Sequence, residues 1–486
     1  MGKYRRLILN TVLFAINAVA TKLITFFLVP LYTYYMSAGE YGLTDMSLTV
    51  INLATPLVTF SIAEAAVRFI VGDSDRQDDY VAISILITLF SVVLVTVLSP
   101  ILDLGAFGGL GEYKAWFILA YATSAFMNLC GEVARGIGEI KLIPICAGIS
   151  SITTFILALV FIGQLKMGIT GYFISVSAGP LLAVIIYMVA GGIGKAFLSG
   201  MKRMRIVAVR DTWNIVRPMI IYALPLIPNN LFWWLSTGIN RLFITGMLGI
   251  AASGMFAAAS KIPGLLNTAY MVFQQAWQLS AYQEVKDKKI GSFFSSVFCV
   301  LQAVLTVLCT VLSFFAPLVA TFMLQGETYK AWPMISILLI ANLFSVFSSF
   351  YGTVYSATMH TSFVMKTTVF GAVACVVFTP MLLPIMGVTG ACVASALGQA
   401  MVFAMRVIDA KRFIQFEVGW KYLAPTLVLL ITQSIFTAWE IGGWKIISGI
   451  CVIIIIIIQM VHIAASLSQI REMKRKIINK KTFIFE

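Results

Sequence analysis

Apolar residues recur along the chain in runs long enough to cross a membrane. A helix needs roughly 20 apolar residues to span the hydrocarbon core, and such runs follow one another from Leu7 to Leu467 with short polar breaks. Alternating segments of the outer-membrane barrel type are absent from the pattern. We therefore predict an all-α integral membrane protein with about fourteen transmembrane helices, near residues 7–35, 42–68, 80–102, 113–134, 142–163, 167–190, 218–245, 249–280, 292–315, 331–356, 362–383, 387–408, 422–440 and 444–467.

The first twelve helices form two similar series. The segment MGITG, Met167–Gly171, recurs as MGVTG, Met386–Gly390, and a weaker echo matches Gly42 with Gly254 at an offset of 212 residues. Six helices in each series give both copies one orientation, as in transporters built from parallel repeats; chance recurrence of glycine motifs is the alternative. We predict an N-lobe at 1–190, a basic cytoplasmic linker at 191–217, a C-lobe at 218–410, and two extra helices with a basic cytoplasmic tail at 411–486.

Composition and charge agree with this class. Of the 486 residues, 60% are hydrophobic and only 11% charged, against about 25% charged in soluble domains. The net charge of +14 would suit a protein that binds nucleic acid, but the distribution of the charges indicates a membrane topology instead. With a cytoplasmic N-terminus, 27 of the 34 Lys and Arg lie in inside segments and four in outside loops. The positive-inside rule then places both termini in the cytoplasm. The basic residues are thus explained by topology, and no nucleic acid is expected. The scattered Cys lack metal-ligand spacing, and neither a metal nor a cofactor is expected.

Three predicted helices carry polar stripes with a basic residue. Lys22 lies ~22 Å into its helix and Lys261 roughly 18 Å, at 1.5 Å per residue. Charged side chains inside a membrane are costly and tend to face a cavity or a partner. On each helix the polar residues share one narrow arc, about 140° wide on the first. The stripes are Asn10, Asn17, Thr21, Lys22 and Thr25; Asn229, Asn230, Ser236, Thr237, Asn240 and Arg241; and Ser260, Lys261, Asn267, Gln274, Gln275 and Gln278.

These stripes predict a water-filled cavity between the lobes, with a cationic centre that suits an anionic substrate. No acidic residue lies at comparable depth: Asp45 is near the outer end of the second helix, and Glu64 and Arg68, near its inner end, are expected to pair with each other. The alternative is that the deep lysines snorkel or bond interhelical carbonyls, and that Arg241, near the outer end of its helix, reaches the headgroups.

Three segments carry a family resemblance: LVPLYTYYMSAGEYGLTDMS (Leu28–Ser47), SIAEAAVRF (Ser61–Phe69) and NRLFITGMLGIAASGMFAAASKI (Asn240–Ile262). The chain resembles the bacterial lipid-linked oligosaccharide flippases, the O-antigen or Wzx-type polysaccharide transporters, a branch of the superfamily that includes multidrug-and-toxin extruders. The family commonly has an acid before the base in the last segment, where this chain has Asn240. An intrahelical partner for Arg241 is therefore missing, which puts ion coupling through that acid in doubt.

The resemblance implies a transporter, not an enzyme. It would move a polyprenyl-diphosphate-linked oligosaccharide repeat unit across the bacterial cytoplasmic membrane by alternating access, for surface polysaccharide synthesis. Partners would be this lipid-linked substrate, membrane lipid, and the polymerase and glycosyltransferases of the pathway. Basic groups suit the diphosphate and amides suit the sugars, so the predicted substrate-binding residues are Lys22, Arg241, Lys261, Asn17, Asn229, Asn230, Asn240, Gln274 and Gln278.

Two other functions compete with this hypothesis. An ion-coupled multidrug or cation antiporter of the same superfamily needs acidic groups deep in its cavity, where this chain offers basic ones. A polymerase or membrane glycosyltransferase needs a large outer loop or a cytosolic nucleotide-sugar domain, and no predicted loop exceeds about thirty residues. A Walker-type phosphate loop is also absent from the sequence, which argues against direct use of ATP.

Overall fold

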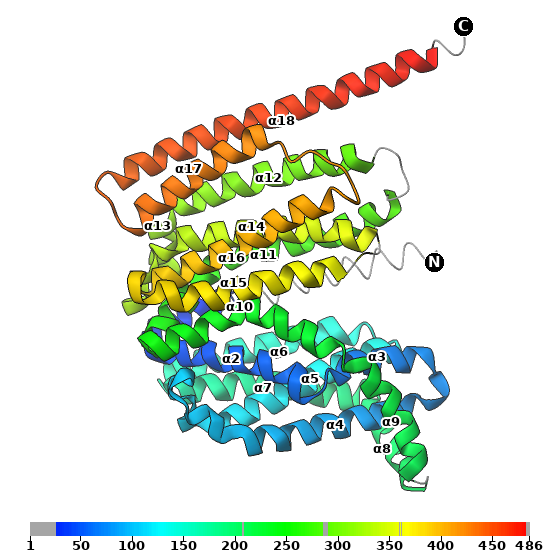
Figure 1. Ribbon diagram of the computed structural model, residues 1–486. Coiled ribbons are helices and arrows are strands. Elements are labelled where there is room, and N and C mark those ends of the chain that lie inside the picture. The colour runs from blue at the N-terminus through cyan, green and yellow to red at the C-terminus, as the bar shows by residue number, and fades with distance from the viewer. Residues whose placement is uncertain (1–25, 207–208, 285–289, 359, 361, 483–486) are drawn as a thin grey trace. The chain divides into compact units, whose positions relative to one another are not determined.

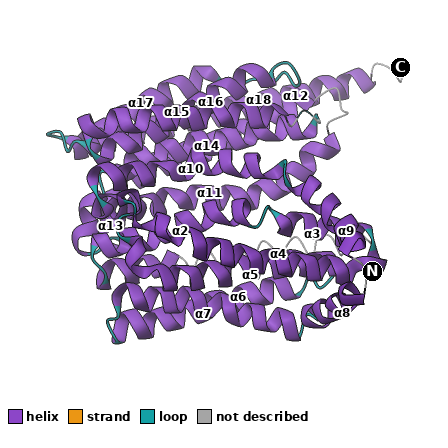
Figure 2. Cartoon of the chain, turned by 60° about the horizontal axis from the view of Figure 1, so that its bottom comes forward, coloured by secondary structure: helices purple, strands orange, loops and turns teal. Residues whose placement is uncertain are grey.

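The computed structural model describes residues 26–206, 209–284, 290–358 and 362–482, together with His360. Within these ranges every regular element is a helix, and short loops join the helices (Figure 2). The described chain forms two compact units by its internal contacts. The first contains the described residues up to Ala258 and Met323–Thr328, and the second contains the described residues from Ala259 onward apart from that short segment.

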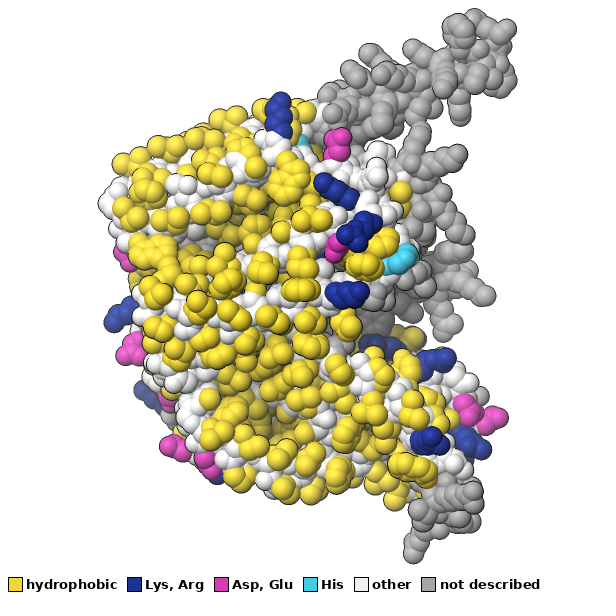
Figure 3. Space-filling view, in the orientation of Figure 1, with side chains coloured by type: hydrophobic (Ala, Val, Ile, Leu, Met, Phe, Trp, Pro, Cys, Tyr) yellow, Lys and Arg dark blue, Asp and Glu magenta, His cyan; other side chains and the backbone are white. Residues whose placement is uncertain are grey.

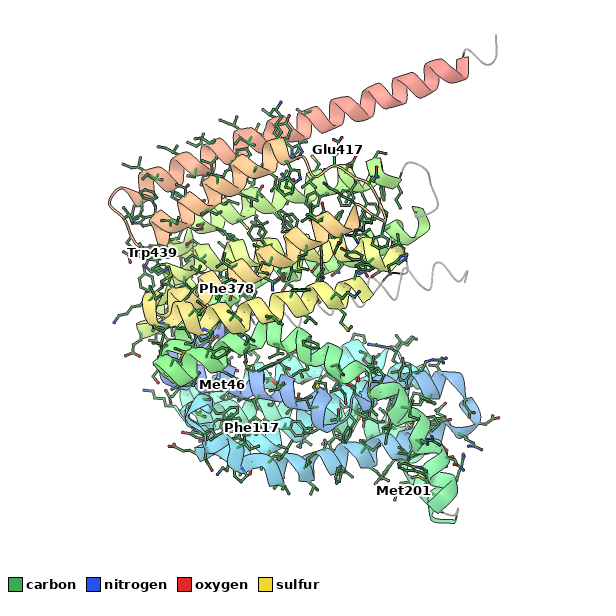
Figure 4. All side chains as sticks on the ribbon, viewed as in Figure 1. Met46, Phe117, Met201, Phe378, Glu417 and Trp439 are labelled. Atoms are coloured by element: carbon green, nitrogen blue, oxygen red, sulfur yellow. The ribbon has the colours of Figure 1, made fainter. Side chains whose placement is uncertain are left out.

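The first unit begins with residues 26–35, the described end of the first helix. Buried side chains such as Met46 and Phe117 lie among its helices (Figure 4). Its remaining helices are α2 (Ala38–Val58), α3 (Ile62–Gly72), α4 (Gln77–Leu98), α5 (Lys114–Ile137), α6 (Leu142–Ala158), α7 (Gly168–Val189), α8 (Ile193–Ile206), α9 (Val209–Ala223) and α10 (Leu226–Leu248), followed by the first turns of α11 (Figure 1).

The second unit holds most of α11 and the helices that follow it. Many of its buried side chains are aromatic: Trp277 of α11, for example, stacks on Phe350 with ring centroids 4.7 Å apart. The helices are α11 (Ile250–Glu284), α12 (Ile290–Phe314), α13 (Ala316–Met323), α14 (Met334–Ala357), α15 (Ser362–Met386), α16 (Val388–Ala410), α17 (Trp420–Ala438) and α18 (Trp444–Thr482) (Figure 1).

Eleven helices of the described chain are long and apolar enough to cross a membrane, or twelve if the bent pair α2 and α3 is one span. On the visible face of each unit, apolar side chains cover the middle of the helices and charged side chains gather at their ends (Figure 3). The prediction of an all-helical, multi-pass membrane protein is therefore confirmed. Most of the predicted first helix lies outside the described residues.

Two predicted helices are interrupted in the structure. The second, predicted at 42–68, bends by 49° between α2 and α3, where Phe60 and Ser61 have positive φ angles of 54° and 50°. A positive φ lies outside the right-handed helical region, so the regular helix ends there. Few non-glycine residues adopt this conformation. The seventh, predicted at 218–245, divides into α9 and α10 around Leu224 and Pro225; proline provides no backbone N–H for the hydrogen bond that would continue α9.

Tryptophan side chains mark one end of the second unit. The rings of Trp332 and Trp444 lie 5.3 Å apart, and Trp439 lies at the opposite end of α17 from Glu417 (Figure 4). Tryptophan is enriched where membrane proteins meet the headgroups. The end with these tryptophans is therefore expected at one membrane surface, which is the external one in the predicted topology.

Reporter fusions can test that topology. Because the basic residues concentrate at predicted inside segments, fusions after Lys202 and after Arg475 should both report the cytoplasm, and a fusion near Gly109 should report the exterior. Paired reporters active on opposite sides of the membrane provide the measurement. An external signal after Lys202 would contradict both the topology and the assignment of the two repeats.

The backbones of α2 and of the first turns of α11 touch within the first unit. A Cβ atom on Gly42 would lie 2.3 Å from the carbonyl oxygen of Ile250, and one on Gly254 would lie 1.9 Å from that of Ala38. Neither position has room for a side chain. The contact is reciprocal, because Ala38 and Ile250 are separated by the same 212 residues as the two glycines. Interfaces related by a two-fold axis have this form.

Candidate functional site

Polar contacts join α10 to α2 and to the start of α3. Arg241 Nε donates a hydrogen bond to the carboxylate of Asp45, and Trp234 Nε1 donates to the carbonyl oxygen of Thr49 at 2.9 Å. Asn230 Nδ2 lies 3.3 Å from the hydroxyl oxygen of Ser61. We name this set of contacts the α2–α10 seam. The two helices are antiparallel, because the residue numbers of the contacts increase along α2 while they decrease along α10.

The ion pair between Asp45 and Arg241 is well shielded from solvent. The carboxylate side chain is 6% exposed and the arginine side chain 18%. Arg241 Nη1 also donates to the carbonyl oxygen of Thr237 at 3.1 Å, and the guanidinium lies over the ring of Phe256, 5.8 Å from its centroid. Removing one partner of a buried pair costs about 3–5 kcal/mol, because it leaves an uncompensated charge. This contact should therefore be a strong connection between α2 and α10.

The acidic partner of Arg241 was missed in the sequence because it lies on another helix. Asn240 replaces the acid expected beside Arg241, but Asp45, 196 positions away, supplies the countercharge. A search along one helix does not find such a partner. The available signal was depth, since Asp45 and Arg241 both fall near the predicted outer ends of their helices.

The expected pairing of Glu64 with Arg68 is wrong. Both residues are described, and no ion pair joins them; Arg68 Nη1 lies beside Gly72 instead. A spacing of four residues brings two helical side chains within reach, but it does not by itself make them pair.

The remaining predicted site residues are described unequally. Asn240 is buried on α10, and Lys261 is half-buried on α11. Gln274 and Gln278 are half-buried on α11, one helical turn apart, and neither amide has a hydrogen-bond partner among the described residues. Asn17, Lys22 and the side chain of Asn229 lie outside the described part of the structure.

Two apolar grooves lie on the surface of the second unit. One, of about 550 Å³, runs between α11 and α12 and is lined by Tyr270, Phe273, Phe293 and Val300 among others. The other, of about 450 Å³, runs between α12 and α18 and shares Val304 with the first. Ligand-binding sites in proteins are likewise concave and mostly apolar.

Comparison with known proteins identifies the family. A family model described as "Polysaccharide biosynthesis protein" matches residues 7–278, more than half of the 486 residues. The chain belongs to the polysaccharide biosynthesis protein family. No curated protein sequence matches the chain.

Solved structures show the fold. The structure described as "Lipid II flippase MurJ, inward closed conformation" aligns with a TM-score of 0.68 and 15% identity, over 92% of this chain and 98% of that one. An inward-facing multidrug resistance MATE family transporter of the MOP superfamily aligns with a TM-score of 0.66 and 13% identity, over 82% and 98%. A MOP superfamily transporter from Pyrococcus furiosus aligns with a TM-score of 0.55 and 17% identity, over 83% of this chain and 96% of that one.

Family and fold agree with the resemblance found in the sequence. The chain belongs to the polysaccharide biosynthesis protein family, and its fold is like that of a lipid II flippase and of MATE transporters of the MOP superfamily.

Proposed function

We propose that the chain is a flippase that moves a polyprenyl-diphosphate-linked oligosaccharide repeat unit across the bacterial cytoplasmic membrane by alternating access, for surface polysaccharide synthesis. The observation that carries this proposal is the family match over residues 7–278. The likeness of fold to a lipid II flippase supports a substrate that is linked to a lipid. The polymerase and glycosyltransferases of the same pathway are the proposed protein partners.

Each part of this substrate has a counterpart in the chain. The diphosphate would be bound by Lys22 and Lys261, because ammonium groups bind phosphate oxygens. The sugars would be bound by amides, and Gln274 and Gln278 support this role because neither amide is engaged within the described protein. The apolar grooves beside α12 support the binding of a long hydrocarbon chain at the surface of the second unit.

The proposed transport cycle uses two six-helix lobes, residues 1–190 and 218–410, within fourteen transmembrane helices. Asn240 and Arg241 would line the outer part of the cavity, and both termini would be cytoplasmic. The ion pair between Asp45 and Arg241 supports an additional role for this arginine. In the proposal, the pair holds α10 against α2 near the outer surface and breaks when the outer side opens to release the substrate.

The multidrug or cation antiporter is the second candidate, and the likeness of fold to multidrug transporters supports it. Such a protein needs a carboxylate that is available to a cation. Asp45 is buried on α2, but the guanidinium of Arg241 already compensates its charge. The flippase is therefore the better supported function.

A deletion strain distinguishes the two functions. Cells without the chain should accumulate lipid-linked repeat units on the cytoplasmic side and lose surface polymer, and the intact chain should restore both. Lipid extraction and polymer staining measure these quantities. Unchanged polymer combined with greater drug sensitivity would contradict the flippase and support the antiporter.

Loss of either deep lysine should strongly reduce export. Lys22→Gln and Lys261→Gln should each lower surface polymer at least about tenfold at equal membrane abundance, because a charged hydrogen bond to phosphate contributes roughly 1.5–3 kcal/mol. Lys22→Arg and Lys261→Arg are the matched controls and should retain more activity, since they keep the positive charge. Wild-type export from both Gln variants would show that the lysines serve packing.

A further inference from the structure

Arg406 is a buried positive charge that the sequence pattern does not reveal. It lies one turn before the end of α16 and is 7% exposed. Because it lies near a predicted inside loop, it is counted among the basic residues at the cytoplasmic surface. Its side chain nevertheless lies between the helices of the second unit. Charged residues inside membrane helices are expensive and are retained where they have a function or a partner.

Every hydrogen-bond partner of the Arg406 side chain is neutral. Nε donates to the hydroxyl of Thr367 at 3.0 Å and Nη1 to the carbonyl oxygen of Ser348 at 2.7 Å. Nη2 lies 3.2 Å from the hydroxyl of Thr368 and 3.5 Å from the carbonyl oxygen of Val364. A guanidinium has five N–H donors, so one N–H of Nη1 has no acceptor in the described structure.

No described carboxylate forms an ion pair with Arg406. Asp409, one turn along α16, lies 3.6 Å from the guanidinium of Arg412 instead. Neutral oxygens satisfy the N–H groups but do not compensate a full positive charge, which is poorly solvated where water is excluded. The charge balance at Arg406 is therefore incomplete.

Two buried hydroxyl groups of the second unit also have no hydrogen-bond partner among the described residues. They are Ser348 Oγ, whose own carbonyl oxygen accepts from Arg406, and Tyr270 OH on α11. The serine is 3% exposed and the tyrosine 4%, and the phenol lies within electrostatic range of Arg406. Hydroxyl groups can donate as well as accept, and leaving a buried donor unpaired is destabilising. A free N–H, an uncompensated charge and two unused hydroxyls together match one bound anion.

We propose that the second unit binds a small monovalent inorganic anion, such as chloride, at Arg406, with the hydroxyls of Ser348 and Tyr270 as further donors. A phosphate group normally engages two donors of the guanidinium fork, whereas Arg406 has one N–H left. The anion compensates the buried charge and connects α16 to α14 and α11. This site is separate from the proposed binding of the diphosphate.

The thermal unfolding of the purified full-length protein tests this proposal. At constant ionic strength, replacing gluconate with chloride or bromide should raise the midpoint temperature in a saturable way. Ser348→Ala and Tyr270→Phe each remove one donor while keeping the shape, and each should weaken the apparent halide affinity at least about tenfold, because each removes a hydrogen bond to a charged group.

Matched controls separate a lost anion contact from a lost hydroxyl. Ser313 on α12 and Tyr32 in the first unit also have buried hydroxyls without a hydrogen-bond partner in the described part of the chain, so Ser313→Ala and Tyr32→Phe should keep the wild-type halide affinity. A wild-type midpoint that is independent of halide would overturn the proposal. A halide effect that survives unchanged in both Ser348→Ala and Tyr270→Phe would also overturn it. Neither result depends on whether the chain exports polysaccharide.

Discussion

Export should fall at least about tenfold when Gly254 is replaced by alanine, and it should stay near normal after the same change at Gly264. A Cβ atom on Gly254 would lie 1.9 Å from the carbonyl oxygen of Ala38, so α2 and α11 would have to move apart. Forcing extra atoms into a packed contact typically costs about 1–3 kcal/mol. A Cβ atom on Gly264, in the same helix, would have no neighbour within 4 Å.

Surface polymer per unit of membrane-inserted protein provides the measurement for both glycine variants. Gly42→Ala should reproduce the effect of Gly254→Ala, because the two contacts are reciprocal. Normal export from Gly254→Ala would show that the backbone contact is not needed at any step of transport.

The second large effect is expected at the ion pair of the α2–α10 seam. Asp45→Asn and Arg241→Gln should each reduce export at least about tenfold, since each leaves one charge buried without its partner. Exchanging the two charges, Asp45→Arg with Arg241→Asp, should recover part of the activity. Export at equal membrane abundance is compared for the single variants, the exchange and the wild type.

An exposed ion pair provides the control for this experiment. Lys114 and Asp103 pair at 2.5 Å with side chains 34% and 56% exposed, and surface pairs contribute only about 0–1 kcal/mol. Lys114→Gln should therefore leave export almost unchanged. If Arg241 serves only to capture the diphosphate, Asp45→Asn would free the guanidinium and maintain or raise export, and the exchange would not restore it. That outcome would contradict the proposed closure of the outer side.

The helices themselves could be predicted because an apolar run of sufficient length has few other uses. The bend at Phe60 and Ser61 could not, since neither residue favours the left-handed conformation that it adopts there. Such a bend depends on packing between helices that are distant in sequence.

Polar stripes predicted which faces of the helices carry polar side chains, but not what those side chains contact. The stripe on α10 contains Arg241 and Asn230, whose partners Asp45 and Ser61 are 196 and 169 positions away. Arg406 was missed for a different reason: counting charges by loop assigns a basic residue near a helix end to the membrane surface. Only the packing of α14, α15 and α16 around its side chain reveals that it is buried.

The reciprocal contact of Gly42 and Gly254 has the form of a homodimer interface enclosed in one polypeptide. In a homodimer of identical halves every contact would occur twice, and each mutation would change both copies. Here the ion pair of Asp45 with Arg241 occurs once: at the same offset of 212 residues the equivalent positions hold Ala257 and Val29. A single chain can therefore carry charge on one side of such a reciprocal contact while the equivalent positions on the other side are apolar.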